Sequence, residues 1–258
     1  MRTSSTLILA ALVAVAPPAF AQQGSVRADP TALFASAFSA YSAGDPALAL
    51  DRYRQAAELG HLPARWKLAR MYEGGDGIER SPEAAYHTYR SIAARFGSIR
   101  PRDRDAVYVA SAFVRLGDYQ RNGVPGVLEP DPVAARRSFF YAAGYFGDAT
   151  AQFELGRMLL TGEGGPKDVR NALRWLKSAA DKDDVGATAL LGSALVHGEG
   201  IVARPVEGMS MILKASENAR EADRPWIEAI RAAAIAHTTP ADVASARAAN
   251  STLEIGGN

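Results

Sequence analysis

One short pattern occurs four times along the chain and restricts the fold more than any other feature of the sequence. In each copy, an alanine is followed by leucine at the fourth position after it, by alanine or glycine at the fifth, and by glycine at the eleventh. The first three positions share one face of an α-helix, and the glycine ends that helix because it adopts the left-handed conformation cheaply. The copies start 48, 39 and 36 residues apart, at Ala64, Ala112, Ala151 and Ala187. Such spacings are typical of solenoids built from helical hairpins.

A second pattern marks the other helix of each hairpin. Two small residues, two others and a glycine occur at residues 56–60, 93–97 and 143–147, and a fourth copy has Asp183 in place of the glycine. Alanine, the best helix former, accounts for 51 of the 258 residues. Capping residues followed by proline mark helix starts, at Asp45-Pro46, Ser81-Pro82, Asp131-Pro132 and Thr239-Pro240.

These patterns predict an all-α protein. A helical-hairpin solenoid spans residues 30–204 and opens with helices near 31–44 and 46–60. A helical C-terminal cap spans residues 205–250, with helices at 206–221, 225–236 and 240–249, because the terminal units of solenoids are usually atypical. Residues 251–258 form a tail.

The N-terminus has the features of a secretory signal peptide at residues 1–21. Arg2 precedes an apolar stretch of about ten residues, and the small residues Ala19 and Ala21 form a cleavage site. A membrane anchor is disfavoured, since the stretch is shorter than the roughly 20 residues that span a bilayer. We expect cleavage after Ala21, a linker at residues 22–29 and a periplasmic protein that does not insert into a membrane after cleavage.

Composition argues against several kinds of function. The chain has no cysteine and a net charge of +1, which disfavours thiolate chemistry and nucleic-acid binding, since the latter needs a basic surplus. The histidines lack the spacing of a zinc site, and no nucleophile–base pair points to a hydrolase. A phosphate loop at residues 162–167 and a calcium site at residues 181–184 are less plausible than helix-ending turns. We therefore expect no catalysis, cofactor or metal.

The repeated motifs resemble Sel1-like repeats, relatives of the tetratricopeptide repeat, over roughly residues 45–200. Residues 60–77 and 151–165 are also similar to repeats of the ExoR-type periplasmic exopolysaccharide regulators of alphaproteobacteria. That resemblance implies a protein that binds the periplasmic sensor region of a membrane histidine kinase, as in ExoS–ChvI signalling, and holds it inactive. It also implies relief of inhibition by a periplasmic protease under acidic conditions, with changes in exopolysaccharide production and motility.

Analogy with tetratricopeptide hairpins places the second and sixth positions after each motif alanine on a concave, partner-binding surface. Aromatic and arginine side chains there would suit a protein interface, although Trp66 and Phe153 could instead be core residues and Arg70 and Arg157 ordinary solvated charges. The candidate partner-binding residues are Trp66, Arg70, Asp118, Arg121, Phe153 and Arg157.

Two functions remain open from the sequence. The first is inhibition of a histidine kinase by stoichiometric binding. The second is a cell-envelope adaptor that scaffolds secretion or polysaccharide machinery without a signalling role. The proteins that crosslink to the chain would distinguish them.

Overall fold

The computed structural model describes residues 28–255, so the expected signal peptide, its cleavage site and nearly all of the linker lie outside the described residues. The described chain is helical, and its only bridge pairing joins Val124 to Leu128. In chain order the elements are α1 (Pro30–Ser42), α2 (Pro46–Glu58), α3 (Leu62–Gly74), α4 (Pro82–Phe96), α5 (Ala106–Asn122), α6 (Pro132–Tyr141), the π-helical turn η1 (Ala142–Phe146), α7 (Ala149–Thr161), α8 (Val169–Ala180), α9 (Val185–His197), α10 (Pro205–Glu217), α11 (Arg224–His237) and α12 (Pro240–Ile255).

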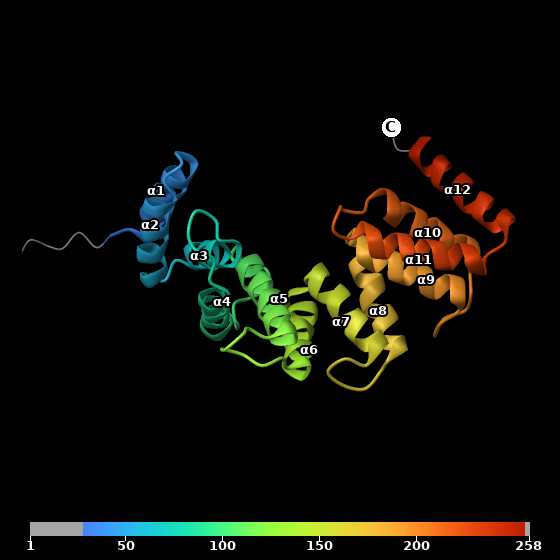
Figure 1. Ribbon diagram of the computed structural model, residues 1–258, viewed down its shortest axis with the longest axis horizontal. Coiled ribbons are helices and arrows are strands. Elements are labelled where there is room, and N and C mark those ends of the chain that lie inside the picture. Colours follow the sequence, from blue (N-terminus) through green and yellow to red (C-terminus); the bar gives the residue numbers. More distant parts are fainter. Residues whose placement is uncertain (1–27, 256–258) are drawn as a thin grey trace, which may run out of the picture.

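The helices form successive pairs that follow one another along the long axis of the molecule (Figure 1). The first five pairs are α1/α2, α3/α4, α5/α6, α7/α8 and α9/α10, and each second helix also packs against the first helix of the next pair. From α1 to α10, each helix thus contacts mainly its neighbours in sequence, which is the arrangement of a solenoid, whereas α11 also packs on α9 and α12 packs on α10. The predicted all-α fold is confirmed.

The repeated glycines follow the first helices of the four motif-bearing pairs, α3, α5, α7 and α9, as predicted. Gly75, Gly162 and Gly198 follow α3, α7 and α9 with φ of 69°, 80° and 72°. In three units a second glycine stands two residues later, at Gly77, Gly164 and Gly200, and packing against the preceding pair also requires it. A Cβ on Gly164 would overlap the carbonyl oxygen of Pro132, at the start of α6 in the preceding pair. The turn is therefore also a contact between units.

The small residue at the fifth motif position allows the two helices of a pair to approach closely. A Cβ on Gly156 would lie 2.8 Å from Cγ of Leu176 in α8, and one on Gly117 would lie 2.8 Å from the ring of Phe139 in α6. Larger residues there would force the paired helices apart. The sequence pattern thus encodes the distance between helices as well as their ends.

Helix starts also follow the predicted caps. The side chains of Asp45, Ser81 and Asp131 accept hydrogen bonds from the backbone N–H three residues later, and Thr239 does the same for Asp242. The pattern that closes the second helix of each pair has Asp183 in place of glycine in its fourth copy. Asp183 adopts the left-handed conformation there, with φ of 62°. Gly97 differs from this scheme, because its φ is −54°.

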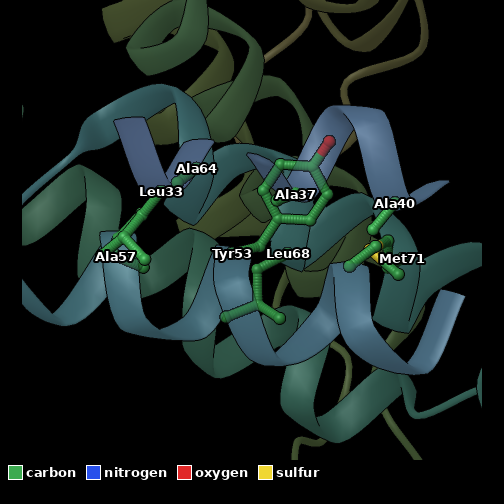
Figure 2. Close-up of a cluster of buried hydrophobic side chains, with 10 residues drawn as sticks. Leu33, Ala37, Ala40, Tyr53, Ala57, Ala64, Leu68 and Met71 are labelled. Atoms are coloured by element: carbon green, nitrogen blue, oxygen red, sulfur yellow. The ribbon is translucent and has the colours of Figure 1, made fainter. Parts of the chain in front are cut away.

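Each joint between helices has its own apolar core. Figure 2 shows the first, in which Leu33, Ala37 and Ala40 of α1 meet side chains of α2 and α3. Tyr53 and Met71 are almost completely buried there, with 1% and 0% exposed. Alanine at the closest contacts, together with bulky side chains such as Tyr53 and Met71, explains how such short helices bury an apolar core.

The C-terminal region departs from its predicted boundaries. The boundary at residue 204 falls inside a hairpin, because α10 pairs with α9 as the other second helices do with their first helices. That helix ends at Glu217 rather than at residue 221. The last helix, α12, packs on α10 and continues to Ile255, past the expected start of the tail. The closing pattern of two small residues and glycine is absent after residue 205, so nothing in the sequence marked these ends.

Candidate partner-binding surface

The second and sixth motif positions build the same contact in two units. In α3, the guanidinium carbon of Arg70 lies 5.9 Å from the centre of the Trp66 ring, and in α7 that of Arg157 lies 5.8 Å from the ring of Phe153. The four-residue spacing places each arginine over its aromatic neighbour on one helix face. Both arginine side chains remain accessible, with 42% and 47% exposed.

The aromatic rings of these pairs are partly buried rather than fully open to a partner. The indole N–H of Trp66 donates to Ser111 Oγ at 3.1 Å, and its ring lies 5.4 Å from that of Tyr108. Phe153 stacks on Trp226 of α11, with ring centres 6.2 Å apart. Each aromatic residue therefore packs against a later unit while one part of it faces the surface, so neither ring is wholly a core side chain.

The unit between them carries an acidic residue at the equivalent position. Val114 is buried, with 8% exposed, while the carboxylate of Asp118 lies 3.5 Å from Nη1 of Arg115. Burial raises the pKa of Asp118 to about 6, and Glu154 also raises it, against the opposing effect of Arg115. Its side chain is still 35% exposed.

Arg121 lies on the same helix face, but its side chain pairs with carboxylates of this protein. Its Nη1 lies 2.7 Å from Oε2 of Glu154 and its Nε 3.0 Å from Oε1 of Glu163, and only 13% of its side chain is exposed. The guanidinium also lies 5.1 Å from the ring of Phe139. Arg121 thus joins α5 to α7 and to the turn that follows α7, and the structure assigns it a place between units rather than an accessible one.

Together these side chains form a ribbon of alternating charge across the first helices of three successive units. Glu73 links α3 to α5, since its carboxylate lies 3.1 Å from Arg70, 3.7 Å from Arg115 and 3.0 Å from the hydroxyl of Tyr89. We call this set the charged ribbon, and its members are Arg70, Glu73, Arg115, Asp118, Arg121, Glu154, Arg157 and Glu163.

The ribbon ends at the fourth unit. There the second motif position holds Ala189, which is fully buried, and the C-terminal helix α11 lies against it through Ile227 and Trp226. A Cβ on Gly186 would lie 2.8 Å from Phe153 and 3.3 Å from Trp226, so the small residues of α9 make room for the two rings. The predicted surface therefore covers three units, and α11 occupies the position that a partner could reach in a fourth.

Sequence reasoning missed Glu73, Arg115 and Glu154, which hold the ribbon together. A signal was present, because Arg115 and Glu154 occupy the third position after their motif alanines, as Lys67 does in the first unit. Charged residues at an equivalent repeat position indicate a common face. What the sequence did not contain is the pairing of these charges between neighbouring helices.

The charged ribbon has the chemistry of a recognition surface. Its arginines can donate to carboxylates, and the adjoining rings of Trp66 and Phe153 can cover apolar side chains. Among the described residues, no group of three or more His, Cys, Asp and Glu side chains could hold a metal ion. No helix in the part of the chain that the structure describes is both long and apolar enough to cross a membrane.

Comparison with known proteins agrees with the fold. The Sel1 repeat family model matches residues 39–61, 62–94, 110–137 and 149–184. In structure, the chain resembles a protective antigen of uropathogenic Escherichia coli that displays an SLR fold, with a TM-score of 0.68 and 26% identity. The similarity covers 86% of this chain and 44% of that one. The protein is thus a Sel1-repeat solenoid.

Two curated relatives define the family more closely. The chain is 38% identical over 214 residues to the exopolysaccharide production negative regulator of Rhizobium meliloti, covering 83% of this chain and 78% of that protein. It is 34% identical to the protein of the same name from Rhizobium leguminosarum, covering 84% and 80%. The chain belongs to this family of Sel1-repeat exopolysaccharide production negative regulators.

Proposed function

We propose that the protein acts in the periplasm, where it binds the sensor region of a membrane histidine kinase and holds the kinase inactive, and so limits exopolysaccharide production and alters motility. The observation that carries this proposal is the 38% identity to a negative regulator over most of both chains. A helical solenoid suits the task, because it presents an extended surface to a protein partner.

The charged ribbon supplies the contacts in this proposal. Arg70 and Arg157 are its accessible ends, each lying over an aromatic ring, and Asp118 lies between them. Buried aromatic and arginine side chains at the centre of an interface usually contribute most of the binding energy. The charges of the ribbon are already paired with one another, so we expect them to add little to the free energy of binding. We expect Trp66 and Phe153, which lose their contact with water when the partner binds, to add more.

Release of the kinase would follow removal of the inhibitor by a periplasmic protease. The loop at residues 98–105 is an accessible place for a first cut, since Arg100 is 84% exposed at its side chain. A cut there would break the chain between α4 and α5, so that only the packing of these two helices on each other would hold the joint. Residues 98–105 thus offer a way to open the array at one joint.

The test is a strain that lacks the protein, compared with strains that carry the wild type or the double variant Arg70→Glu with Arg157→Glu. We expect deletion to raise kinase output and exopolysaccharide, and the folded double variant to restore repression poorly. The variant Lys177→Glu with Lys214→Glu, which changes the charge equally on second helices, should restore it fully. Unchanged kinase output after deletion would contradict the proposal, and crosslinks only to secretion or polysaccharide machinery would favour an adaptor.

A further inference from the structure

A groove lies on the side of the molecule away from the charged ribbon. It has a volume of about 560 Å³ and runs between α6 and α8, the second helices of two successive units. Leu155 and Leu159 of α7 form its floor. At 100° per residue these leucines are about 200° around α7 from Phe153 and Arg157, so the groove and the ribbon occupy opposite faces of the same helix.

The walls of the groove expose large apolar side chains. Phe140 and Val133 lie seven residues apart on α6, and 59% and 53% of them is exposed. Trp175 of α8 faces Phe140 across the groove, with the ring centres 6.3 Å apart and the planes at 78°. The π-helical turn η1 begins directly after Phe140 and Tyr141, and such turns often occur at functional sites. Exposed aromatic side chains gathered in one concave place are typical of a protein-binding site.

The rim of the groove is positively charged. Arg136 and Arg137 of α6 line it, and Arg174 of α8 hydrogen-bonds to the lining residue Asn171 at 3.4 Å. Arg136 donates to the carbonyl oxygen of Pro166, a neutral acceptor. Within the part of the chain that the structure describes, none of these three arginines forms an ion pair. This is the reverse of the charged ribbon, where every arginine is paired with a carboxylate.

One acidic residue, Asp168, lines the groove, and its carboxylate is engaged locally. Its oxygens accept from the backbone N–H of Asn171 at 3.1 Å and from the side-chain amide of Asn171 at 2.6 Å. Asp168 therefore caps α8. Its hydrogen bonds with Asn171 lower the pKa of its carboxyl, an effect to which Arg136 also contributes, so Arg137 and Arg174 are the rim charges left uncompensated. The groove combines an apolar floor, exposed aromatic walls and uncompensated positive charge.

We infer that the groove between α6 and α8 binds an acidic amphipathic segment of the kinase sensor region, with apolar side chains against Phe140 and Trp175 and carboxylates on Arg137 and Arg174. This inference rests on the proposed function, because it takes the sensor region as the partner. The complementary charges select the segment and raise its association rate. The apolar contacts contribute most of the affinity.

The test measures binding of the mature protein to the purified sensor region by titration calorimetry. Phe140→Glu should weaken binding at least tenfold, while Phe38→Glu should leave it within twofold, since Phe38 is equally exposed at 60% but lies on α1. Arg137→Glu with Arg174→Glu should also weaken binding at least tenfold, and Arg90→Glu with Arg102→Glu should not. Raising the salt concentration should weaken the wild type more than the Arg137/Arg174 variant. Circular dichroism verifies that each variant is folded.

The outcomes separate the two proposals. A wild-type protein that binds the sensor region equally well after Phe140→Glu would overturn the groove assignment and leave the proposed function intact. A wild-type protein that does not bind the sensor region would overturn the proposed function, and the groove assignment with it. A dimer that Phe140→Glu converts to a monomer in light scattering would make a second copy of the chain the occupant, which also overturns the inference.

Discussion

Single residues in this solenoid often serve two purposes, and the second glycine of each turn shows it best. Gly164 needs a left-handed backbone, with φ of 69°, and also lies where a Cβ would overlap Pro132. Gly126 needs nearly the same backbone, with φ of 73°, but has open space around its Cβ position. A Cβ at Gly126 would therefore cost only the strain of the left-handed backbone. A Cβ at Gly164 would cost the same strain and, in addition, the overlap with Pro132.

We expect Gly126→Ala to reduce the free energy of unfolding by about 1 kcal/mol, the usual cost of a left-handed alanine. Gly164→Ala should cost about 2–4 kcal/mol, since the same strain is joined by overpacking against α6. Urea unfolding followed by circular dichroism measures both. Equal losses at the two positions would show that the contact with Pro132 relaxes without cost.

Asp118 gives the ribbon a dependence on pH. Its pKa in the folded protein is about 6, above the value of about 3.9 for an unfolded aspartate. The folded state therefore binds this proton more tightly, and the residue's contribution to stability decreases as the pH rises from about 4 to 6. When Asp118 loses its proton, its new negative charge lies close to the carboxylates of Glu154 and Glu73. Both of these raise its pKa in addition to the effect of burial.

The variant Asp118→Asn removes that titration. The difference in unfolding free energy, variant minus wild type, should grow by about 1 kcal/mol between pH 4 and pH 7, a figure reduced for the partial exposure of the carboxylate. Urea unfolding at the two pH values gives the difference, in which titrating groups remote from Asp118 cancel. If the ion pair with Arg115 outweighed burial, the difference would shrink with rising pH instead.

At the scale of helices, the ribbon determines how units are joined. Arg121 connects α5 to α7 through Glu154, and both side chains are mostly buried, with 13% and 15% exposed. Arg70 pairs with Glu73 within α3, and its side chain is 42% exposed. The first pair is a joint between units, and the second is a local contact on the surface of one helix.

Removing the arginine should therefore have different effects at the two places. Arg121→Ala should destabilise the protein by about 3–5 kcal/mol, because it leaves a buried carboxylate without its partner. Arg70→Ala should cost less than about 1 kcal/mol, as exposed pairs do. Thermal and urea unfolding of both variants measure this. A small loss for Arg121→Ala would mean that Arg157 alone satisfies Glu154.

Most helix ends within the repeats could be predicted from the sequence because they depend on local chemistry. The Asp45, Ser81 and Asp131 caps and the glycines after α3, α7 and α9 act within a few residues of their own position. The π-helical turn, the place of Trp226 against Phe153 and the groove beside Phe140 arise from packing between units. Such packing depends on several helices at once, and a single repeat motif does not contain it.

In the candidate site too, features that depend on one helix could be predicted, whereas features that depend on packing between helices could not. Repeat register placed Trp66 with Arg70 and Phe153 with Arg157 on one face, because a four-residue spacing is a property of any helix. It did not show that Arg121 would be enclosed by Glu154 and Glu163, since these residues are 33 and 42 positions away in sequence.

The whole molecule behaves as a linear array, since its helices contact mainly their neighbours. Stability in such arrays is a sum over units and their joints, so damage can stay local. Ile227 of α11 and Ile92 of α4 are both fully buried, but they belong to cores that share no helix. Replacing either by alanine should cost about 2–5 kcal/mol.

Hydrogen exchange shows which helices lose stability in each of these two variants. We expect Ile227→Ala to raise exchange in α9, α10 and α11 while α3, α4 and α5 remain protected, and Ile92→Ala to do the reverse, because each core stabilises only its own joint. An equal loss of protection along the entire chain in both variants would show that the array opens as one cooperative unit. In that case a single cut at residues 98–105 would unfold the whole inhibitor, whereas local opening would leave the α6–α8 groove intact after the cut.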